Sequence, residues 1–186
     1  LVVERGVRPV ELFGGGGSRH EYGNLPYYIT TPILLGILEK GVPAESITVM
    51  VQKEVAERIV ASPGCKDYGV LSVSLQYYAS CEYVLDVPAE YFSPKPKVDS
   101  AVVNLRLKKE RILKPEEEKQ FFGIVKTAFS QRRKTLLNSL AGAAGGDRER
   151  LGKVLAEAGI DASRRPETLS IEEFAKLSCY LREDLT

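Results

Sequence analysis

Six consecutive residues, Gly23-Asn24-Leu25-Pro26-Tyr27-Tyr28, combine an amide, a proline and two aromatic rings. The side chain of Asn24 and a backbone carbonyl held rigid by proline can accept hydrogen bonds, and Tyr27 offers a flat face for stacking. At the carboxyl edge of a sheet, where α/β proteins bind ligands, such a group could hold a substrate. Because Asn and Pro are also common in turns, a purely structural turn is an equally open interpretation.

A second group, Phe92-Ser93-Pro94-Lys95-Pro96-Lys97-Val98-Asp99-Ser100, places an aromatic ring on a loop with alternate prolines. Proline fixes its own φ angle and favours an extended residue before it, so we expect the loop to present Phe92 in a defined place. Lys95 and Lys97 add positive charge to the same loop. The alternative interpretation is a rigid edge loop whose Phe92 belongs to the core.

A third group, Phe129-Ser130-Gln131-Arg132-Arg133-Lys134-Thr135-Leu136, contains three consecutive basic residues at a helix junction. No acid lies between Lys126 and Lys134, and basic residues of segment 95–109 add further positive charge. A charge run is usually only solvated surface. One basic face on a nearly neutral protein, however, favours a phosphate backbone as partner.

The composition is that of an ordinary globular protein. The 186 residues are 44% hydrophobic, and 26 Lys plus Arg against 25 Asp plus Glu give a net charge of +1, so global charge does not attract nucleic acid. No apolar run reaches the roughly 18 to 20 residues that span a bilayer, and Leu1 to Gly6 lacks the apolar stretch of a signal peptide. We therefore predict no membrane association and a cytoplasmic location.

The cysteines and the histidine do not indicate metal binding or catalysis. Cys65, Cys81 and Cys179 are odd in number and far apart, and His20 is the only histidine. A zinc site is therefore not expected, and a Ser-His-Asp or Cys-His catalytic device would require an imidazole in the right surroundings. We predict no metal ligands, three reduced cysteines and a surface histidine.

Strands and helices that alternate along the first part of the chain predict an α/β layered sheet. Thr31 and Pro32 form a helix start, and Gly41 ends the apolar stretch that follows. The predicted elements are a helix at 31–41, a strand at 47–51, a helix at 53–60 and strands at 83–87 and 101–107. Leu71 to Tyr77 alternates apolar and polar residues, which locally favours a strand, although a helix is not excluded over so few residues.

The residues after about Arg111 predict a small helical domain. Pro115 and three acids begin a helix with an apolar stripe, and shorter helices are expected near 136–140 and 151–158. Ser170 with Glu173 forms a capping box that opens a last helix. We accordingly place the domain boundary between residues 110 and 111.

The three groups, in this order, resemble the ribosomal RNA adenine dimethyltransferase family. The resemblance runs along nearly all of Gly23 to Leu140. It is carried by Asn24-Leu25-Pro26-Tyr27 with Ile29-Thr30-Thr31-Pro32-Ile33-Leu34, by Met50-Val51-Gln52-Lys53-Glu54-Val55-Ala56, by Gln76-Tyr77-Tyr78, by the Phe92 to Ser100 loop and by Gln131-Arg132-Arg133-Lys134-Thr135-Leu136. The last segment is more similar to the ribosome-biogenesis branch than to the macrolide-resistance methylases.

This resemblance implies a Rossmann-like class I methyltransferase domain with a mixed sheet at 1–110 and a small, all-helical RNA-binding domain at 111–186. It also implies that residues 71–78 are helical, against the local pattern. The implied activity is methyl transfer from S-adenosylmethionine to the exocyclic amines of two adjacent adenosines near the 3′ end of small-subunit (16S) ribosomal RNA. The implied partner is the immature small ribosomal subunit, and we expect a monomer.

The resemblance also assigns roles to residues. Asn24 and the carbonyl of Leu25 or Pro26 would hold the amine, and Tyr27 and Phe92 would clamp the flipped base. Glu4 resembles the acid that binds the ribose of the cofactor. Asn24 is also expected to bind the cofactor. The residues expected to grip RNA phosphates are Lys95, Lys97, Arg132, Arg133 and Lys134.

The segment before Asn24 departs from the family. Residues 14–18, Gly-Gly-Gly-Gly-Ser, are typical of a flexible linker, with a phosphate-cradling loop as the alternative. The helix, strand and helix that the family has between Glu4 and Asn24 cannot fit there. We therefore expect a truncated or engineered enzyme that lacks most of the cofactor pocket and methylates feebly or not at all. The rival hypothesis is a non-catalytic ribosomal RNA-binding or ribosome-assembly module.

Overall fold

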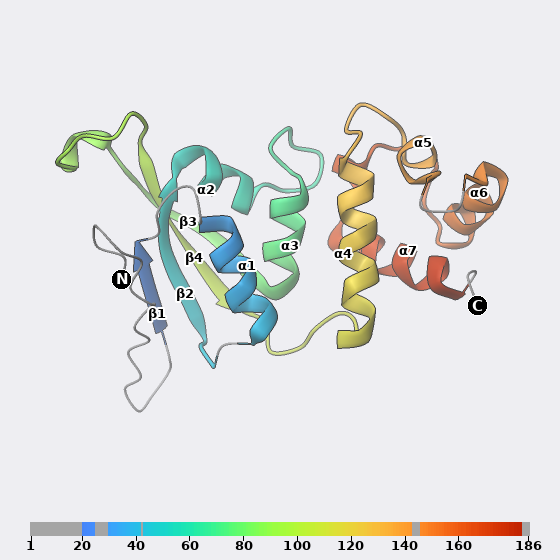
Figure 1. The fold of residues 1–186 in the computed structure, drawn as a ribbon, viewed down its shortest axis with the longest axis horizontal. Helices are drawn as coiled ribbons and strands as arrows, with labels where there is room; N and C mark the ends of the chain where they lie inside the picture. Colours follow the sequence, from blue (N-terminus) through green and yellow to red (C-terminus); the bar gives the residue numbers. More distant parts are fainter. Residues whose placement is uncertain (1–19, 25–29, 42, 143–145, 184–186) are drawn as a thin grey trace. The chain divides into compact units, whose positions relative to one another are not determined.

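The computed structural model of the chain describes residues 20–24, 30–41, 43–142 and 146–183 (Figure 1). The chain divides into two compact units. The first unit consists of the residues up to Ala61 together with Ser74–Lys109, and the second of Ser62–Val73 together with the residues from Glu110 onward. The amino-terminal strand and the linker predicted at 1–4 and 14–18 lie outside the described residues. No helix among the described residues has the length and apolar character needed to cross a membrane.

The first unit is built on a mixed four-stranded sheet. Its strands are β1 (His20–Asn24), β2 (Ser46–Gln52), β3 (Ala79–Val87) and β4 (Ser100–Leu107). Their order is β1-β2-β4-β3, with β1 parallel to β2 and the other pairs antiparallel (Figure 1). The strands predicted at 47–51, 83–87 and 101–107 are confirmed, and β3 begins four residues earlier than expected.

The central strands owe their position to alternating buried residues. Ile47, Val49 and Val51 of β2 are almost completely buried, and so are Val103 and Leu105 of β4, which pair with two of them. Val49 pairs with Val103 and Ile47 with Leu105, so β-branched and apolar side chains stack across the strands on one face. This row of pairs forms the core of the sheet.

Two helices of the first unit follow the predicted pattern. Helix α1 (Thr30–Lys40) buries Leu34 and Leu38, and Gly41 ends it at a φ of 70°, which glycine adopts at low cost. Helix α2 (Lys53–Val60) has the predicted bounds. Its contacts with β2, β3 and β4 fix its start at the carboxyl end of β2.

The alternating pattern at 71–78 does not form a strand, because the structure has helix α3 (Val70–Tyr78) there. Leu75 is completely buried, but Ser72 and Ser74 are buried as well. Two of the three polar residues of the apparent strand pattern are thus small and buried, and the third, Gln76, donates to the carbonyls of Ile59 and Ala61, so they do not form one solvent-facing row. The local strand prediction is wrong, and the helix that the family resemblance implied is confirmed.

The second unit is helical among its described residues. Its elements are α4 (Pro115–Phe129), α5 (Leu136–Leu140), α6 (Arg148–Glu157), the short 3₁₀ helix η2 (Pro166–Thr168) and α7 (Ile171–Glu183). Its core includes the rings of Phe129 and Phe174, whose centroids lie 5.9 Å apart. Gly159, at a φ of 71°, follows the end of α6 as predicted.

Candidate functional site

The described residues Gly23 and Asn24 of the first group lie at the same end of the sheet as the two ends of the loop that contains the second group. Asn24 ends β1 and pairs with Met50, near the end of the parallel strand β2. Gln52, the last residue of β2, pairs with Ser100, which also pairs with Val87 at the end of β3. The carboxyl ends of three strands and the loop 88–99 therefore meet at this edge, which we call the ligand edge (Figure 1).

The structure places only part of the predicted site. The backbone of Asn24 lies at the ligand edge, and Phe92 lies on the loop that borders it. Leu25, Pro26 and Tyr27 lie outside the described residues, and so does Glu4. Their predicted roles stay predictions.

The loop that carries Phe92 is held by hydrogen bonds at both ends. The carboxylate Oδ1 of Asp99 accepts the backbone N–H of Ala89 at 2.9 Å, and the carbonyl of Asp99 accepts the N–H of Lys53 at 3.0 Å. The 3₁₀ helix η1 (Ala89–Tyr91) adds a bond from the Phe92 N–H to the Ala89 carbonyl at 3.3 Å. Asp99 thus ties the end of the loop to its start and to α2, a role that sequence analysis missed.

Two aromatic residues stand side by side on this loop. Phe92 is half-buried, and Tyr91 is 74% exposed. Lys95 and Lys97 are both exposed, as phosphate-binding lysines must be. Sequence analysis did not single out Tyr91, although an aromatic pair directly before a proline-rich stretch was a usable signal.

An ion pair braces the same edge. The ammonium of Lys53 lies 2.9 Å from Oδ1 of Asp86, and the Tyr83 hydroxyl donates to that oxygen at 2.6 Å. The hydrogen bond from Tyr83, and then that from Lys53, hold the pKa of Asp86 below its ordinary value. Burial, helped by the bond to Asp86, raises the pKa of Tyr83 to about 12, so this phenol stays protonated at neutral pH.

The basic segment predicted for RNA belongs to the second unit and plays two roles. Nη2 of Arg132 donates to the carbonyl of Lys66 at 2.5 Å and to that of Tyr68 at 3.3 Å. Arg132 therefore fastens the segment before α3 to the end of α4. Arg133 and Lys134 are exposed, so their charged groups are accessible to a partner.

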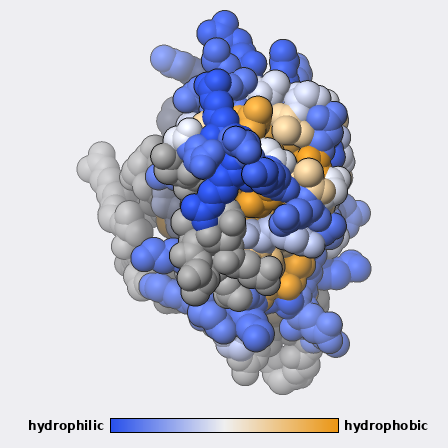
Figure 2. Space-filling view, turned by 90° about the vertical axis from the view of Figure 1, so that its right-hand side faces the viewer, coloured by the Kyte–Doolittle hydropathy of each residue, from blue (hydrophilic) through white to orange (hydrophobic). Residues whose placement is uncertain are grey.

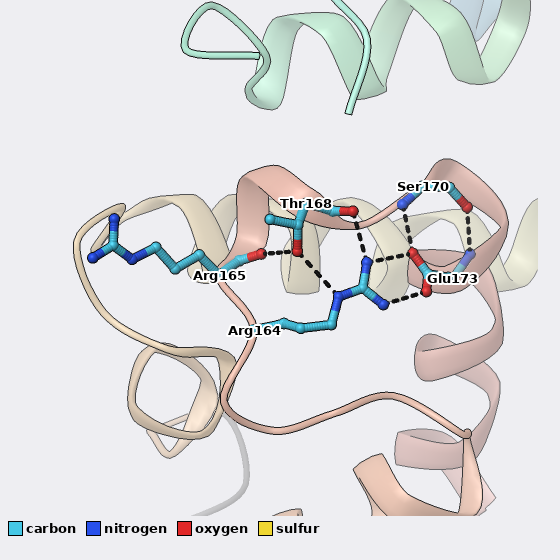
Figure 3. Close-up of polar contacts among 5 residues, drawn as sticks. All are labelled: Arg164, Arg165, Thr168, Ser170 and Glu173. Atoms are coloured by element: carbon cyan, nitrogen blue, oxygen red, sulfur yellow. Dashed lines mark hydrogen bonds and ion pairs between the residues drawn. The ribbon is translucent and has the colours of Figure 1, made fainter. Parts of the chain in front are cut away.

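A second arginine, Arg164, joins residues before α7 to the start of that helix (Figure 3). Arg164 forms a bidentate ion pair with Glu173, with N–O distances of 2.5 and 3.0 Å, and donates to the carbonyl of Thr168 at 2.7 Å. Ser170 and Glu173 exchange the two hydrogen bonds of a capping box at the start of α7, as predicted. The hydrogen bond from Arg164 lowers the pKa of Glu173 below its ordinary value.

Comparison with known proteins shows what this arrangement is similar to. Residues 20–183 match the model of a family described as ribosomal RNA adenine dimethylase. The ribosomal RNA small subunit methyltransferases A of Bacillus mycoides (strain KBAB4) and Bacillus anthracis (strain A0248) are each 48% identical to the chain over 171 residues. The alignments cover 90% of this chain and 59% of either relative, so the chain spans about three fifths of their length.

Solved structures share the fold. A dimethyladenosine transferase from Plasmodium falciparum superposes with a TM-score of 0.78 at 22% identity, over 95% of this chain and 70% of that one. The 23S rRNA methyltransferase ErmE superposes with a TM-score of 0.64 at 24% identity, over 93% and 69% of the two chains. At this level of identity the similarity concerns the backbone fold alone.

Proposed function

The chain belongs to the ribosomal RNA adenine dimethylase family, and on this basis we propose that it serves methyl transfer from S-adenosylmethionine to the exocyclic amines of adenosines in ribosomal RNA. Its fold is of the Rossmann-like class that the similar structures share. The proposed targets are two adjacent adenosines near the 3′ end of small-subunit (16S) RNA in the immature subunit. The observation that supports this proposal is that the backbone of Asn24 and the two ends of the braced loop that carries Phe92 lie at the same end of the sheet.

The proposed chemistry needs placement rather than a tuned acid or base. The lone pair of an adenine amine is delocalised into the ring, so acceptors that favour a pyramidal nitrogen make it a better nucleophile. We assign this task to the side chain of Asn24 and the carbonyl of Leu25 or Pro26. S-adenosylmethionine, when bound, supplies an electrophilic methyl group on sulfur. The position of Asn24 at the carboxyl edge of parallel strands fits a cofactor there, and Glu4 would bind its ribose.

Aromatic faces would hold the flipped base in the proposed mechanism. Tyr27 and Phe92 would stack on opposite faces of the adenine, each contact contributing about 1 to 3 kcal/mol. The hydrogen bonds of Asp99 support this role for Phe92, because they limit the movement of the loop. Lys95 and Lys97, exposed on the same loop, would neutralise phosphates next to the target.

The test is the transfer of tritium from labelled S-adenosylmethionine to immature small subunits. We expect weak transfer by the wild-type chain, because the cofactor pocket expected from its sequence is incomplete, with loss in Asn24→Ala and Tyr27→Ala. Subunit binding, measured by co-sedimentation, should remain in both variants because phosphate contacts are intact. Binding of wild type without any transfer would reject methylation and favour an assembly module that recognises the RNA and does no chemistry.

A further inference from the structure

Three segments that are far apart in the sequence converge at the carboxyl end of α4, all within the second unit (Figure 1). Arg132 of segment 130–136 donates to two carbonyls of segment 62–69. The N–H of Gly64 donates to the carbonyl of Glu167 at 2.7 Å, and the N–H of Leu136 to that of Arg164 at 2.8 Å. Every pair of the three segments, 62–69, 130–136 and 164–168, is thus joined by at least one hydrogen bond.

The ring of Tyr68 anchors the first of these segments. This residue is completely buried, and its ring centroid lies 6.1 Å from that of Phe129 in an edge-on contact. Because Phe129 is the last residue of α4, the contact holds segment 62–69 against the end of that helix. The backbone that carries the neighbouring Lys66 is therefore fixed.

These segments concentrate positive charge. They contain six basic residues, Lys66, Arg132, Arg133, Lys134, Arg164 and Arg165, against two acids, Asp67 and Glu167, whereas the whole chain carries 26 against 25. The carboxyl end of a helix has a partial negative charge that favours nearby cations, which offsets part of their mutual repulsion. Glu172 and Glu173 of α7 act on Tyr68 at the same place, and Glu173 is paired with Arg164, so the six cations still outnumber the four nearby acids.

The six basic residues divide into two sets by their contacts. Arg132 and Arg164 use their guanidinium groups on carbonyls and on Glu173 within the fold. Arg165 extends away from that network (Figure 3). The residues whose side chains are exposed and have no such structural task are Lys66, Arg133, Lys134 and Arg165.

We propose that Lys66 and Arg165 join Arg133 and Lys134 in one phosphate-binding surface that grips the backbone of the substrate RNA. We call it the cationic surface, and its role rests on the function proposed above. A phosphate backbone is the partner that fits, because the exposed cations come from three segments and outnumber the acids of those segments. Of the two α7 acids that act on Tyr68, Glu172 and Glu173, the second is already paired with Arg164. Figure 2 shows the face at the right-hand side of the Figure 1 view, where hydrophobic areas are interrupted by hydrophilic side chains.

The test compares salt dependence between variants. The full chain is titrated with a radiolabelled transcript of the 3′-terminal part of small-subunit RNA at several salt concentrations. The double variant Lys66→Ala with Arg165→Ala should bind about tenfold more weakly at about 0.1 M salt, and the slope of log K against log salt should fall by about 2, because each lost phosphate contact on a duplex removes about 0.9. Unchanged affinity and slope would overturn the proposal.

Two control variants separate charge from folding. Lys119→Ala with Lys153→Ala removes the same charge from α4 and α6 at exposed positions outside the three segments and should leave the slope unchanged. Lys66→Arg with Arg165→Lys keeps the charge and should retain the wild-type slope. Equal loss in this charge-preserving variant would overturn the proposal.

Methyl transfer by the wild type, measured in parallel, keeps the two proposals distinguishable. Transfer together with an unchanged slope in Lys66→Ala with Arg165→Ala rejects only the cationic surface. A reduced slope without any transfer by wild type rejects only the methylation.

Discussion

Side chains that form hydrogen bonds with the backbone hold together both the ligand edge of the first unit and the cationic surface of the second. The backbone group is an N–H at the ligand edge and a carbonyl at the cationic surface. At the ligand edge, the carboxylate of Asp99 accepts an N–H and so holds an aromatic loop. At the cationic surface, the guanidinium of Arg132 donates to two carbonyls and so holds a second cation-bearing segment. An anion organises the place proposed for chemistry, and a cation organises the place proposed for binding.

The two regions also differ in the range of the forces that we propose for them. The proposed stacking on Phe92 would act over a few ångströms and would depend on where the ring lies. Attraction of phosphates to Arg133 and its neighbours extends over roughly a Debye length of 8 to 10 Å and tolerates small shifts. Changes at the ligand edge should therefore alter the rate of transfer, and changes at the cationic surface should alter affinity in a salt-dependent way.

The strongest test of this contrast is Phe92→Ala. Loss of one stacking face should lower methyl transfer about 100-fold, which corresponds to about 2.7 kcal/mol, near the upper end of the range for stacking. Affinity for the RNA should change less than about threefold, since the phosphate contacts remain. Tritium transfer and filter binding measure the two quantities.

Phe92→Tyr is the matched control, because it keeps the ring and should retain most of the transfer. A loss of affinity as large as the loss of transfer in Phe92→Ala would break the division between the two regions. A weaker salt dependence in Phe92→Ala would break it too.

The next largest effect is expected inside the second unit, at Glu173. Glu173→Ala removes the two-pronged pair with Arg164 and half of the capping box with Ser170. The carboxylate side chain is 34% exposed, so solvent weakens the pair, and we expect a loss of about 2 kcal/mol of unfolding free energy. Urea denaturation followed by circular dichroism measures it, and Glu173→Gln separates the charge from the cap.

The same residue predicts a pH dependence. The hydrogen bond from Arg164 lowers the pKa of Glu173 in the folded state, so the folded chain binds this proton less readily than the unfolded one. The stabilisation is complete above the ordinary value of 4.5 and is lost as the pH falls through the folded pKa. In Glu173→Gln this part of the acid dependence should disappear. If the unfolding free energy of Glu173→Gln fell with decreasing pH as much as that of wild type, the pair would not stabilise the fold.

Much of the fold could be predicted because the local sequence patterns favoured the same helices and strands that packing in the folded chain requires. Pro115 with its acids marks the start of α4, and the bounds of α2 follow from its amphipathic spacing. The local prediction of a strand at 71–78 was wrong because Ser72 and Ser74 are buried in a helix. When small polar residues are buried, the spacing of polar and apolar residues no longer shows which side of the helix faces solvent. Only the family resemblance indicated the helix.

The candidate site could be predicted in its types of residue but not in its assembly. Asn24 and Phe92 were recognisable from motifs, and parallel pairing of β1 with β2 brings the backbone of Asn24 to the expected edge. Arg132 and Lys66 are joined across 66 positions, and no local pattern carries that information. Lys66 and Arg165 therefore stood out only in the folded chain.

Asp99→Ala should have a smaller effect than Phe92→Ala, because it loosens the loop without removing the ring. It leaves the N–H of Ala89, a buried residue, without its acceptor. We expect methyl transfer to fall about tenfold, with affinity for the RNA nearly unchanged. Asp99→Asn keeps an oxygen acceptor and should restore most of the transfer. Equal activity of Asp99→Ala and wild type would show that the loop needs no such brace.

The smallest effect is expected at the ion pair of Lys53 with Asp86, although it lies at the ligand edge. Both side chains are about half exposed, and exposed pairs contribute little because water and salt screen them. Lys53→Met should change transfer less than about twofold, since the N–H of Lys53 still donates to the Asp99 carbonyl whatever the side chain. Asp86→Asn should behave similarly and retains an oxygen for the Tyr83 hydroxyl. A loss in Lys53→Met as large as that in Asp99→Ala would mean that charge also positions the ligand edge, and the contrast with the cationic surface would then be one of degree.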